Sequence, residues 1–291
     1  RDEVKFLADE HGMDYGDMEK WYDGYQIGNE TSMFNPNSVM EAVTRHHCKS
    51  YWPSSATFSN VARYIGWNFE GLQDDVISML AGGRCIVDPT TFQNDMREIN
   101  LKDDVFTVLI HLGYLSYNWN TDECYIPNRE VAGEMVNAVR TNRWGNVVTA
   151  LEQSRQLLDA TLRCDTATVA HMVEEVHSND TSILSYNTEN SLACVISLAY
   201  YYARNDYHIE REYATGSGFA DMVLLPRKNV AKPAIIVELK KDGTAEGAIK
   251  QIKERHYARK VKDYTGDILL VGINYDTGTK QHTCLIERTV Y

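Results

Sequence analysis

A series of short apolar runs in the last third of the chain narrows the possible folds more than any other feature. Five runs have the β-branched and aromatic character of strands. They span residues 207–213, 219–226, 233–240, 267–274 and 282–290. A helical pattern at 188–204 precedes them, and an amphipathic segment at 244–264 separates the third run from the fourth. This order predicts an α+β fold with a helix, three strands, a second helix and two more strands in a mixed sheet, and it lacks the alternation of a doubly wound fold.

The first half of the sequence is predicted to be mostly helical. Asn35 and Pro36 fit an N-cap and the first position of a helix over 36–43. The stretch 105–139 predicts a helix that ends near Gly113, two strands around a turn at 120–123, and a helix that begins after Asn128. A helix, a hairpin and a helix are compatible with a winged-helix-like unit, so we expect a first domain over residues 1–146.

Residues 147–178 predict two helices joined near Cys164 and Asp165, with Asp165 as the cap of the second. We expect residues 147–180 to lead into a second domain, 147–291. The charge also changes along the chain. Residues 1–180 contain 14 Lys and Arg against 28 Asp and Glu, whereas residues 181–291 contain 15 against 13. The excess of acidic residues lies in the front part of the chain. The net charge of the whole chain therefore does not argue against a negatively charged partner, such as nucleic acid, for the rear part.

Cysteine usage and hydropathy indicate the compartment. Six cysteines lie far apart without a Cys-x-x-Cys pair, so we expect free thiols in a reducing cytoplasm. His46, His47 and Cys48 are adjacent, but no second ligand cluster has zinc spacing, so a metal is not expected there. The first residues are charged and do not resemble a signal peptide, and no apolar run approaches the roughly 20 residues of a membrane span.

Charged residues interrupt two of the apolar runs. Side chains alternate between the faces of a strand, so Glu238 and Lys240 project from one face of the 233–240 run. If the loop between Pro226 and Pro233 is symmetric, Val223 lies opposite Ile236, and Asp221 lies opposite Glu238. Two carboxylates at this separation repel each other, and a divalent cation such as Mg²⁺ or Mn²⁺ is the natural partner for them. The alternative is an ordinary surface pair formed by Glu238 and Lys240.

The sequence resembles the PD-(D/E)XK nuclease superfamily in these residues. Asp221 is followed by sixteen residues and then by Glu-Leu-Lys, within the predicted αβββαβ order. "GSGFADMVLLP", "KPAIIVELK", "AIKQIKERHYA" and "ILLVGINYD" are similar to the nuclease part of the branch found at the C-terminus of bacterial AAA-ATPase-like proteins. "KWYDGYQIG", "FNPNSVM", "LGYLSY" and "IPNREV" are similar to the end of the ATPase-like region of that branch. The resemblance implies a restriction-endonuclease-like core behind a helical domain.

The resemblance also implies roles for individual residues. Asp221 and Glu238 match the acids that bind the metal, and Lys240 matches the lysine of the motif. Glu189 matches an acid that often supplements the site as a metal ligand, although the first turn of a helix also favours an acid. Gln251 matches a helix glutamine beside the site, with a solvated helix position as the alternative.

Basic residues gather on the segment after Glu238. Lys241, Lys250 and Lys253 are candidates for contact with a phosphate backbone. The alternative is the solvated face of an amphipathic helix whose buried stripe contains Ala245, Ile249 and Ile252. The helix pattern alone does not decide between them.

The expected function is metal-dependent hydrolysis of phosphodiester bonds in nucleic acid, with DNA favoured over RNA. The alternative is a nuclease fold that has lost activity and binds nucleic acid or protein. The acidic front half suggests a protein partner, such as an ATPase region. The sequence has no G-x-x-x-x-G-K-[ST] motif, so we do not expect ATP hydrolysis by this chain, either because an ATPase core was cut away or because the protein never had one.

Overall fold

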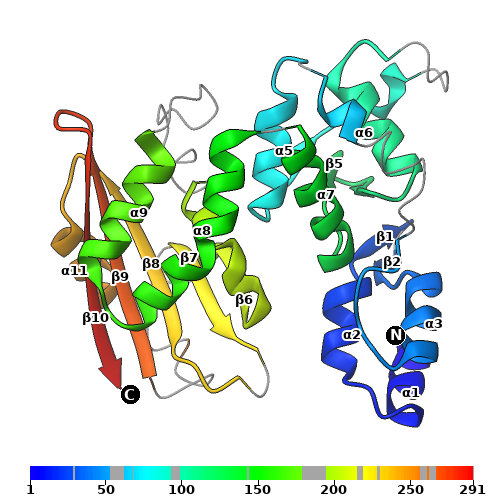
Figure 1. Cartoon of the computed structure of the whole chain (residues 1–291), viewed down its shortest axis with the longest axis horizontal. Helices are drawn as coiled ribbons and strands as arrows, with labels where there is room; N and C mark the ends of the chain where they lie inside the picture. The colour runs from blue at the N-terminus through cyan, green and yellow to red at the C-terminus, as the bar shows by residue number, and fades with distance from the viewer. Residues whose placement is uncertain are drawn as a thin grey trace. The chain divides into compact units, whose positions relative to one another are not determined.

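The computed structural model describes most of the chain (Figure 1). The described residues are 1–28, 30–52, 62–67, 69–92, 99–142, 144–178, 195–214, 219–227, 230–255, 261 and 267–290. The chain divides into two compact units, Arg1–Trp144 and Gly145–Tyr291. What the two predicted domains do stays a prediction.

The front unit is mostly helical, as predicted. Its helices are α1 (Asp2–Glu10), α2 (Tyr15–Tyr22), α3 (Pro36–Arg45), α5 (Leu72–Leu80), α6 (Lys102–His111), α7 (Arg129–Thr141) and the short η1 (Pro89–Thr91). Its strands are β1 (Tyr25–Ile27), β2 (Glu30–Met33), β3 (Cys85–Ile86), β4 (Ser116–Asn118) and β5 (Glu123–Tyr125). The predicted cap at Asn35 is present, because Asn35 accepts from the N–H groups of Asn37 and Ser38. The helix predicted to begin after Asn128 does so, and the Asn128 side chain caps it by accepting from the Val131 N–H. The predicted hairpin is β4 and β5, which lie with β3 in the order β3-β5-β4.

Segments that are distant in the sequence meet inside the front unit. The Tyr25 hydroxyl donates to the Gly113 carbonyl (3.0 Å), and the Tyr125 hydroxyl donates to the Gly24 carbonyl (3.1 Å). Gly24 has a φ of +108°, and a Cβ there would lie 2.1 Å from the Pro127 carbonyl oxygen. No other residue fits this close approach of two backbones. Three of the four front segments quoted for the family resemblance are therefore in contact with one another, through the hydrogen bond of Tyr25 to Gly113 and the approach of Gly24 to Pro127.

The rear unit is a sheet with helices on both faces. Its elements are α8 (Gly145–Leu162), α9 (Thr166–Ser178), η2 (Tyr201–Asn205), β6 (Tyr207–Ala214), β7 (Phe219–Pro226), β8 (Ala234–Lys241), α11 (Ala245–Glu254), β9 (Asp267–Asp276) and β10 (Gln281–Val290). Asp165 caps α9 through the Thr168 N–H (3.1 Å), as predicted. The strand order is β10-β9-β8-β7-β6, in which β8 and β9 are parallel and the other pairs are antiparallel. This mixed sheet confirms the predicted fold class.

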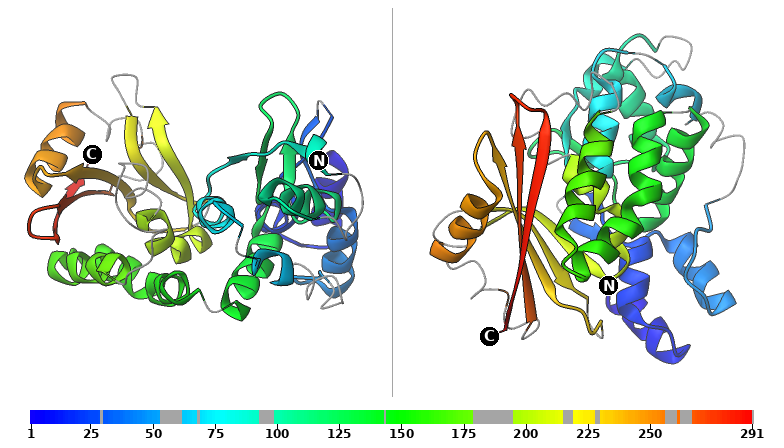
Figure 2. Two further views of the ribbon diagram at one scale, coloured as in Figure 1. Left: turned by 90° about the horizontal axis from the view of Figure 1, so that it is seen from above. Right: turned by 60° about the vertical axis from the view of Figure 1, so that its left-hand side comes forward.

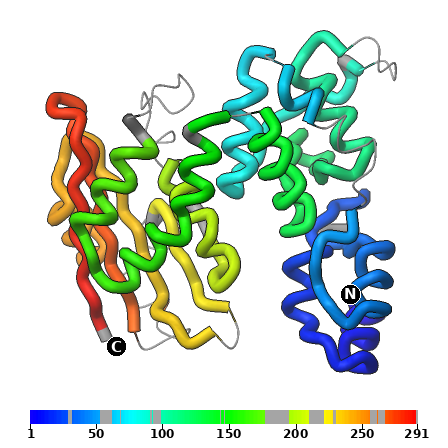
Figure 3. The backbone as a smooth tube through the Cα atoms, in the orientation of Figure 1, coloured from blue at the N-terminus to red at the C-terminus, as the bar shows by residue number. Residues whose placement is uncertain are grey.

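Two hydrophobic cores lie on opposite faces of the sheet. Ile235, Val237 and Leu239 of β8 pack in one core with residues of α8 and α9. Ile236 of the same strand packs in the other core with Ile249 and Ile252 of α11. Figure 2 shows α11 on the side of the sheet away from α8 and α9, and Figure 3 draws the backbone of these elements as a tube. The alternation predicted for residues 235–240 is confirmed.

Three further expectations can be compared with the described residues. The cysteines at positions 48, 85, 124, 164 and 284 are free. No helix in the described ranges has the length and hydrophobicity that a membrane crossing requires. The helix predicted over 244–264 begins as expected, with the Thr244 hydroxyl accepting from the Gly247 N–H (2.9 Å), and its described part ends at Glu254.

Candidate active site

The β7–β8 hairpin has the register that the sequence predicted. Val223 pairs with Ile236, and Met222 pairs with Val237. Asp221 and Glu238 are the next residues of the two strands beyond this pairing, and the charge of Asp221 acts on the Glu238 carboxyl. There the Oδ2 atom of Asp221 accepts a hydrogen bond from the Leu239 N–H (2.6 Å). The two carboxylates are therefore neighbours at the end of this strand pair.

Glu238 is 2% exposed, and its two carboxylate oxygens have different surroundings. Oε1 accepts a hydrogen bond from the amide nitrogen of Gln251, and Lys240 Nζ lies 3.4 Å from the same oxygen. Lys240 Nζ also donates to Gln251 Oε1 (2.6 Å). Oε2 is buried and has no hydrogen-bond partner among the residues that the structure describes. Glu238, Lys240 and Gln251 thus form a hydrogen-bonded cluster, and within the described residues this cluster leaves Oε2 of Glu238 available to a ligand.

Electrostatics of the cluster favour a bound cation. Burial and, after it, the charge of Asp221 raise the pKa of Glu238 to about 7, although Lys240 opposes the rise. A buried carboxylate with an open oxygen beside a second carboxylate fits a small divalent ion, which takes oxygen ligands and keeps several waters. Among the described residues, no group of three or more His, Cys, Asp or Glu side chains has a metal-binding arrangement. The described part of the site therefore brings together two carboxylates, those of Asp221 and Glu238.

A glycine on β9 allows α11 to reach the cluster. Gly272 pairs with Glu238 across the parallel β8–β9 ladder. A Cβ at Gly272 would lie 2.4 Å from the Ala245 carbonyl oxygen and 3.0 Å from the Ala248 Cβ. The first turn of α11 therefore rests directly on the glycine, and Gln251, less than two turns later, reaches Glu238. The sequence reasoning missed Gly272, although a lone glycine inside an apolar strand is a signal for such a close approach.

Asn274 is a second residue that the sequence did not single out. It pairs with Lys240 across the same ladder, and its side chain is 4% exposed. Its Oδ1 accepts a hydrogen bond from the Gly243 N–H (2.9 Å). This bond ties the turn between β8 and α11 to the sheet, next to Lys240. A polar residue two positions after Gly272, on the same face of an apolar strand, was the available signal.

The remaining predicted site residues lie apart from the cluster or outside the described residues. Lys241 is exposed at the end of β8. Lys250 is paired with Glu254 (3.6 Å), and Lys253 is paired with Glu287 of β10 (2.5 Å). Glu189 falls outside the described residues.

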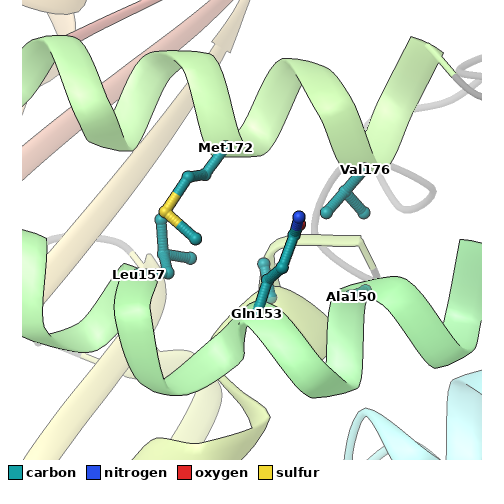
Figure 4. Close-up of a pocket in the computed structure, with 6 residues that line it drawn as sticks. Ala150, Gln153, Leu157, Met172 and Val176 are labelled. Carbon is teal, nitrogen blue, oxygen red and sulfur yellow. The ribbon is translucent and has the colours of Figure 1, made fainter.

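A small pocket lies among the helices on the opposite face of the sheet (Figure 4). Residues of α8 and α9 and Ala199 line it, and the space between them is too small to hold a water molecule. The lining is mostly apolar, and Gln153 contributes a polar side chain to it. This pocket contains none of the predicted site residues.

Comparison with known proteins agrees with the resemblance in the rear unit. A family model described as the PD-(D/E)XK nuclease superfamily matches residues 187–283. The matched range contains Asp221, Glu238, Lys240 and Gln251, and the strands and helix that position them. No curated protein matches the chain significantly. The association with AAA-ATPase-like proteins stays a prediction.

Proposed function

We propose, on the basis of the family match in residues 187–283, that the rear unit is a metal-dependent nuclease that hydrolyses phosphodiester bonds, with DNA as the substrate. The observation that carries the proposal is the open, buried Oε2 of Glu238 beside the carboxylate of Asp221. A surface ion pair leaves both carboxylate oxygens to solvent. Here burial and repulsion disfavour the charged carboxylate unless a cation lies beside it.

The residues of the cluster divide the chemistry among them. Asp221 and Glu238 would hold Mg²⁺ or Mn²⁺ through oxygen ligands, as the hardness of these ions requires. When bound, the ion lowers the pKa of a coordinated water and polarises the phosphate. Lys240 is held by Gln251 on the same face, where its ammonium group can position the attacking water or stabilise negative charge that develops on the phosphate. Gln251 orients both Glu238 and Lys240 and is a positioning residue.

The two units have different proposed tasks. The nuclease domain is residues 147–291, with α8 and α9 in its lead-in, and Glu189 is proposed as a supplementary acid. The acidic front unit is proposed to contact a protein, such as an ATPase region, because its charge disfavours contact with nucleic acid.

The test is incubation of the chain with labelled single- and double-stranded DNA and RNA, in Mg²⁺, Mn²⁺ or EDTA. We expect cleavage of DNA in the presence of either metal and none in EDTA. Asp221→Ala is the matched variant, and it controls for a contaminating nuclease. Binding of nucleic acid without cleavage under every condition would instead support an inactive nuclease fold that serves as a binding module.

A further inference from the structure

Three residues connect β8 to α11, and they determine how the end of the strand lies against the helix. This β8–α11 link consists of Asp242, Gly243 and Thr244. The candidate site depends on the link, because Lys240 lies before it and Gln251 lies after it. Lys240 Nζ donates to Gln251 Oε1 (2.6 Å), so a shift of the link moves one partner of this bond away from the other.

The link is hydrogen-bonded to the sheet at two successive residues. The Asp242 N–H donates to the Tyr275 carbonyl (2.8 Å), and the Asp242 carboxylate accepts from both the N–H and the hydroxyl of Thr277 (both 2.7 Å). The Gly243 N–H donates to Asn274 Oδ1 (2.9 Å). Thr277 lies in the exposed turn between β9 and β10, whereas Asn274 lies within β9 and is 4% exposed. The link thus has an exposed anchor at Thr277 and a buried anchor at Asn274.

The buried anchor holds Gly243 against the Lys240 side chain. Asn274 pairs with Lys240 across the parallel β8–β9 ladder. A Cβ added at Gly243 would lie 3.3 Å from the Lys240 Cβ, 3.6 Å from the Lys240 Cγ and 3.7 Å from Asn274 Oδ1. Gly243 therefore lies against the stem of Lys240 and beside the amide of Asn274. Contact along the stem restricts the rotamers of a long side chain, and it thereby helps to fix the position of the ammonium group.

The amide of Asn274 is not needed for packing. On this face of β9, Ile268 and Leu270 pack in the core with α11, so an apolar side chain would continue the pattern. A buried amide costs free energy unless it is hydrogen-bonded, and Asn274 finds its partner in the β8–α11 link. The change from apolar to polar residues in β9 occurs at the level of the ladder where β8 presents Glu238 and Lys240. The strand register therefore places this amide where it can serve the site.

We propose that Asn274 is a positioning residue of the candidate site: by holding Gly243, it keeps the Lys240 ammonium group in place beside the Glu238 carboxylate. This inference deepens the proposed function and rests on it. Asn274 itself contacts neither substrate nor metal, and its effect on the reaction passes through Lys240. Loss of an interaction that acts only in the transition state lowers kcat and leaves KM little changed, so the amide is expected to matter for rate and not for binding.

The test compares Asn274→Leu with Thr277→Ala in the full chain. Asn274→Leu removes the buried anchor and keeps a side chain with the same branching. Thr277→Ala weakens the exposed anchor of the same link and is the matched control. Gly243→Ala is a second variant, in an exposed position, that keeps the backbone N–H and places a methyl group against the stem of Lys240.

Three measurements are made on each variant. The ammonium signal of Lys240 is observed by ¹⁵N NMR in EDTA and is assigned by its absence from Lys240→Arg. Cleavage of labelled DNA in Mn²⁺ gives kcat and KM separately. Urea denaturation gives the folded fraction, so that rates are compared between folded molecules.

We expect Asn274→Leu to move the Lys240 signal to the position of a solvated lysine. It should also lower kcat by about tenfold to 100-fold, in the range for a displaced catalytic group. KM should change little. Gly243→Ala is expected to change the signal and kcat in the same direction by less, because the hydrogen bond to Asn274 remains. Thr277→Ala should keep the wild-type signal and kcat even if its stability falls, which separates positioning of Lys240 from a purely structural effect.

Two results would overturn the inference. One is a wild-type Lys240 signal in folded Asn274→Leu, or in Gly243→Ala if Asn274→Leu does not fold. The other is an equal change of the signal in Thr277→Ala and Asn274→Leu, since the link as a whole would then position Lys240 without a special role for Asn274. Failure of the proposed function looks different, because a wild type that cleaves nothing leaves the NMR comparison of the variants intact.

Discussion

The two faces of the five-stranded sheet are built from the same strands and carry different kinds of side chain. On the face covered by α8 and α9, β8 presents Ile235, Val237 and Leu239 to a continuous apolar core. On the face covered by α11, the same strand presents Ile236 to a smaller core and then Glu238 and Lys240. The first face stabilises the fold by burying apolar side chains. The second face has charged side chains at positions where apolar ones would add to stability. The comparison predicts that mutations on the two faces separate stability from activity.

The largest expected effect is the loss of cleavage on the α11 face. Asp221→Ala and Glu238→Ala each remove a carboxylate that the proposed metal requires. We expect a fall in cleavage rate of about 100-fold or more with the fold retained. Rates are measured on labelled DNA in Mn²⁺, with circular dichroism of each variant. Lys240→Ala should lose cleavage while DNA binding persists, and cleavage at the wild-type rate by either acid variant would refute the site.

The opposite face should show the reverse behaviour. Ile235→Ala removes a fully buried side chain from the strand that carries Glu238. We expect the free energy of unfolding to fall by about 2–5 kcal/mol, while kcat of the folded protein changes little. Urea denaturation and cleavage assays on the same preparation provide the measurement. A large loss of kcat without a loss of stability would contradict the division between the faces.

Metal binding on the α11 face is expected to stabilise the folded protein, which distinguishes this face from the apolar one. A ligand that binds only the folded state stabilises it by roughly 2.7 kcal/mol at a hundredfold excess over Kd. We therefore expect Mn²⁺ to raise the melting temperature of wild type, and Asp221→Asn to remove most of this rise. Thermal melts in EDTA and in saturating Mn²⁺ separate the cases. An identical shift in both proteins would mean that the metal binds elsewhere.

The pKa of Glu238 gives the metal-free protein a dependence on pH. Burial, together with the charge of Asp221, raises this pKa to about 7, above its value in the unfolded chain. Between roughly pH 4.5 and 7 the folded state therefore binds more protons than the unfolded state, so stability falls as pH rises through this window. The difference is of order 3 kcal/mol. Glu238→Gln should lack this loss, and urea melts of both proteins in EDTA at pH 4.5 and pH 8 would reveal it.

Much of this arrangement was predictable because it is local in the sequence. Pro226 and Pro233 limit the hairpin loop, and the alternation of side chains then placed Asp221 opposite Glu238. The caps at Asn35 and Thr244 and the helix start after Asn128 were also visible, because the beginning of a helix depends on neighbouring residues. These features follow from spacing within about twenty residues.

The contacts across the crossover from β8 to β9 were not predictable in the same way. The pairing of Gly272 with Glu238 and of Asn274 with Lys240 depends on how far β9 slides along β8, and residues 242–266 connect the two strands. No spacing rule fixes that register. The contacts of Gly24 with Pro127 in the front unit are a similar case, since about a hundred residues separate them.

The smallest expected effect tests this long-range contact. Gly272→Ala places a methyl group against the backbone of α11, where the added Cβ would lie 2.4 Å from the Ala245 carbonyl oxygen. A backbone atom cannot rotate away, so α11 has to shift and Gln251 moves with it. We expect a loss of about 1–2 kcal/mol in the free energy of unfolding, within the range for overpacking, and urea denaturation measures it.

Gly278→Ala is the matched control for Gly272→Ala. Its Cβ would approach only the Asp276 carboxylate, at 3.3 Å, in the exposed turn between β9 and β10. We expect little change in its stability or cleavage. For Gly272→Ala we expect cleavage to fall more than stability alone explains, because Gln251 orients both Glu238 and Lys240. If cleavage by Gly272→Ala equals that of Gly278→Ala at matched folded fraction, the close approach of α11 matters for packing and not for the site.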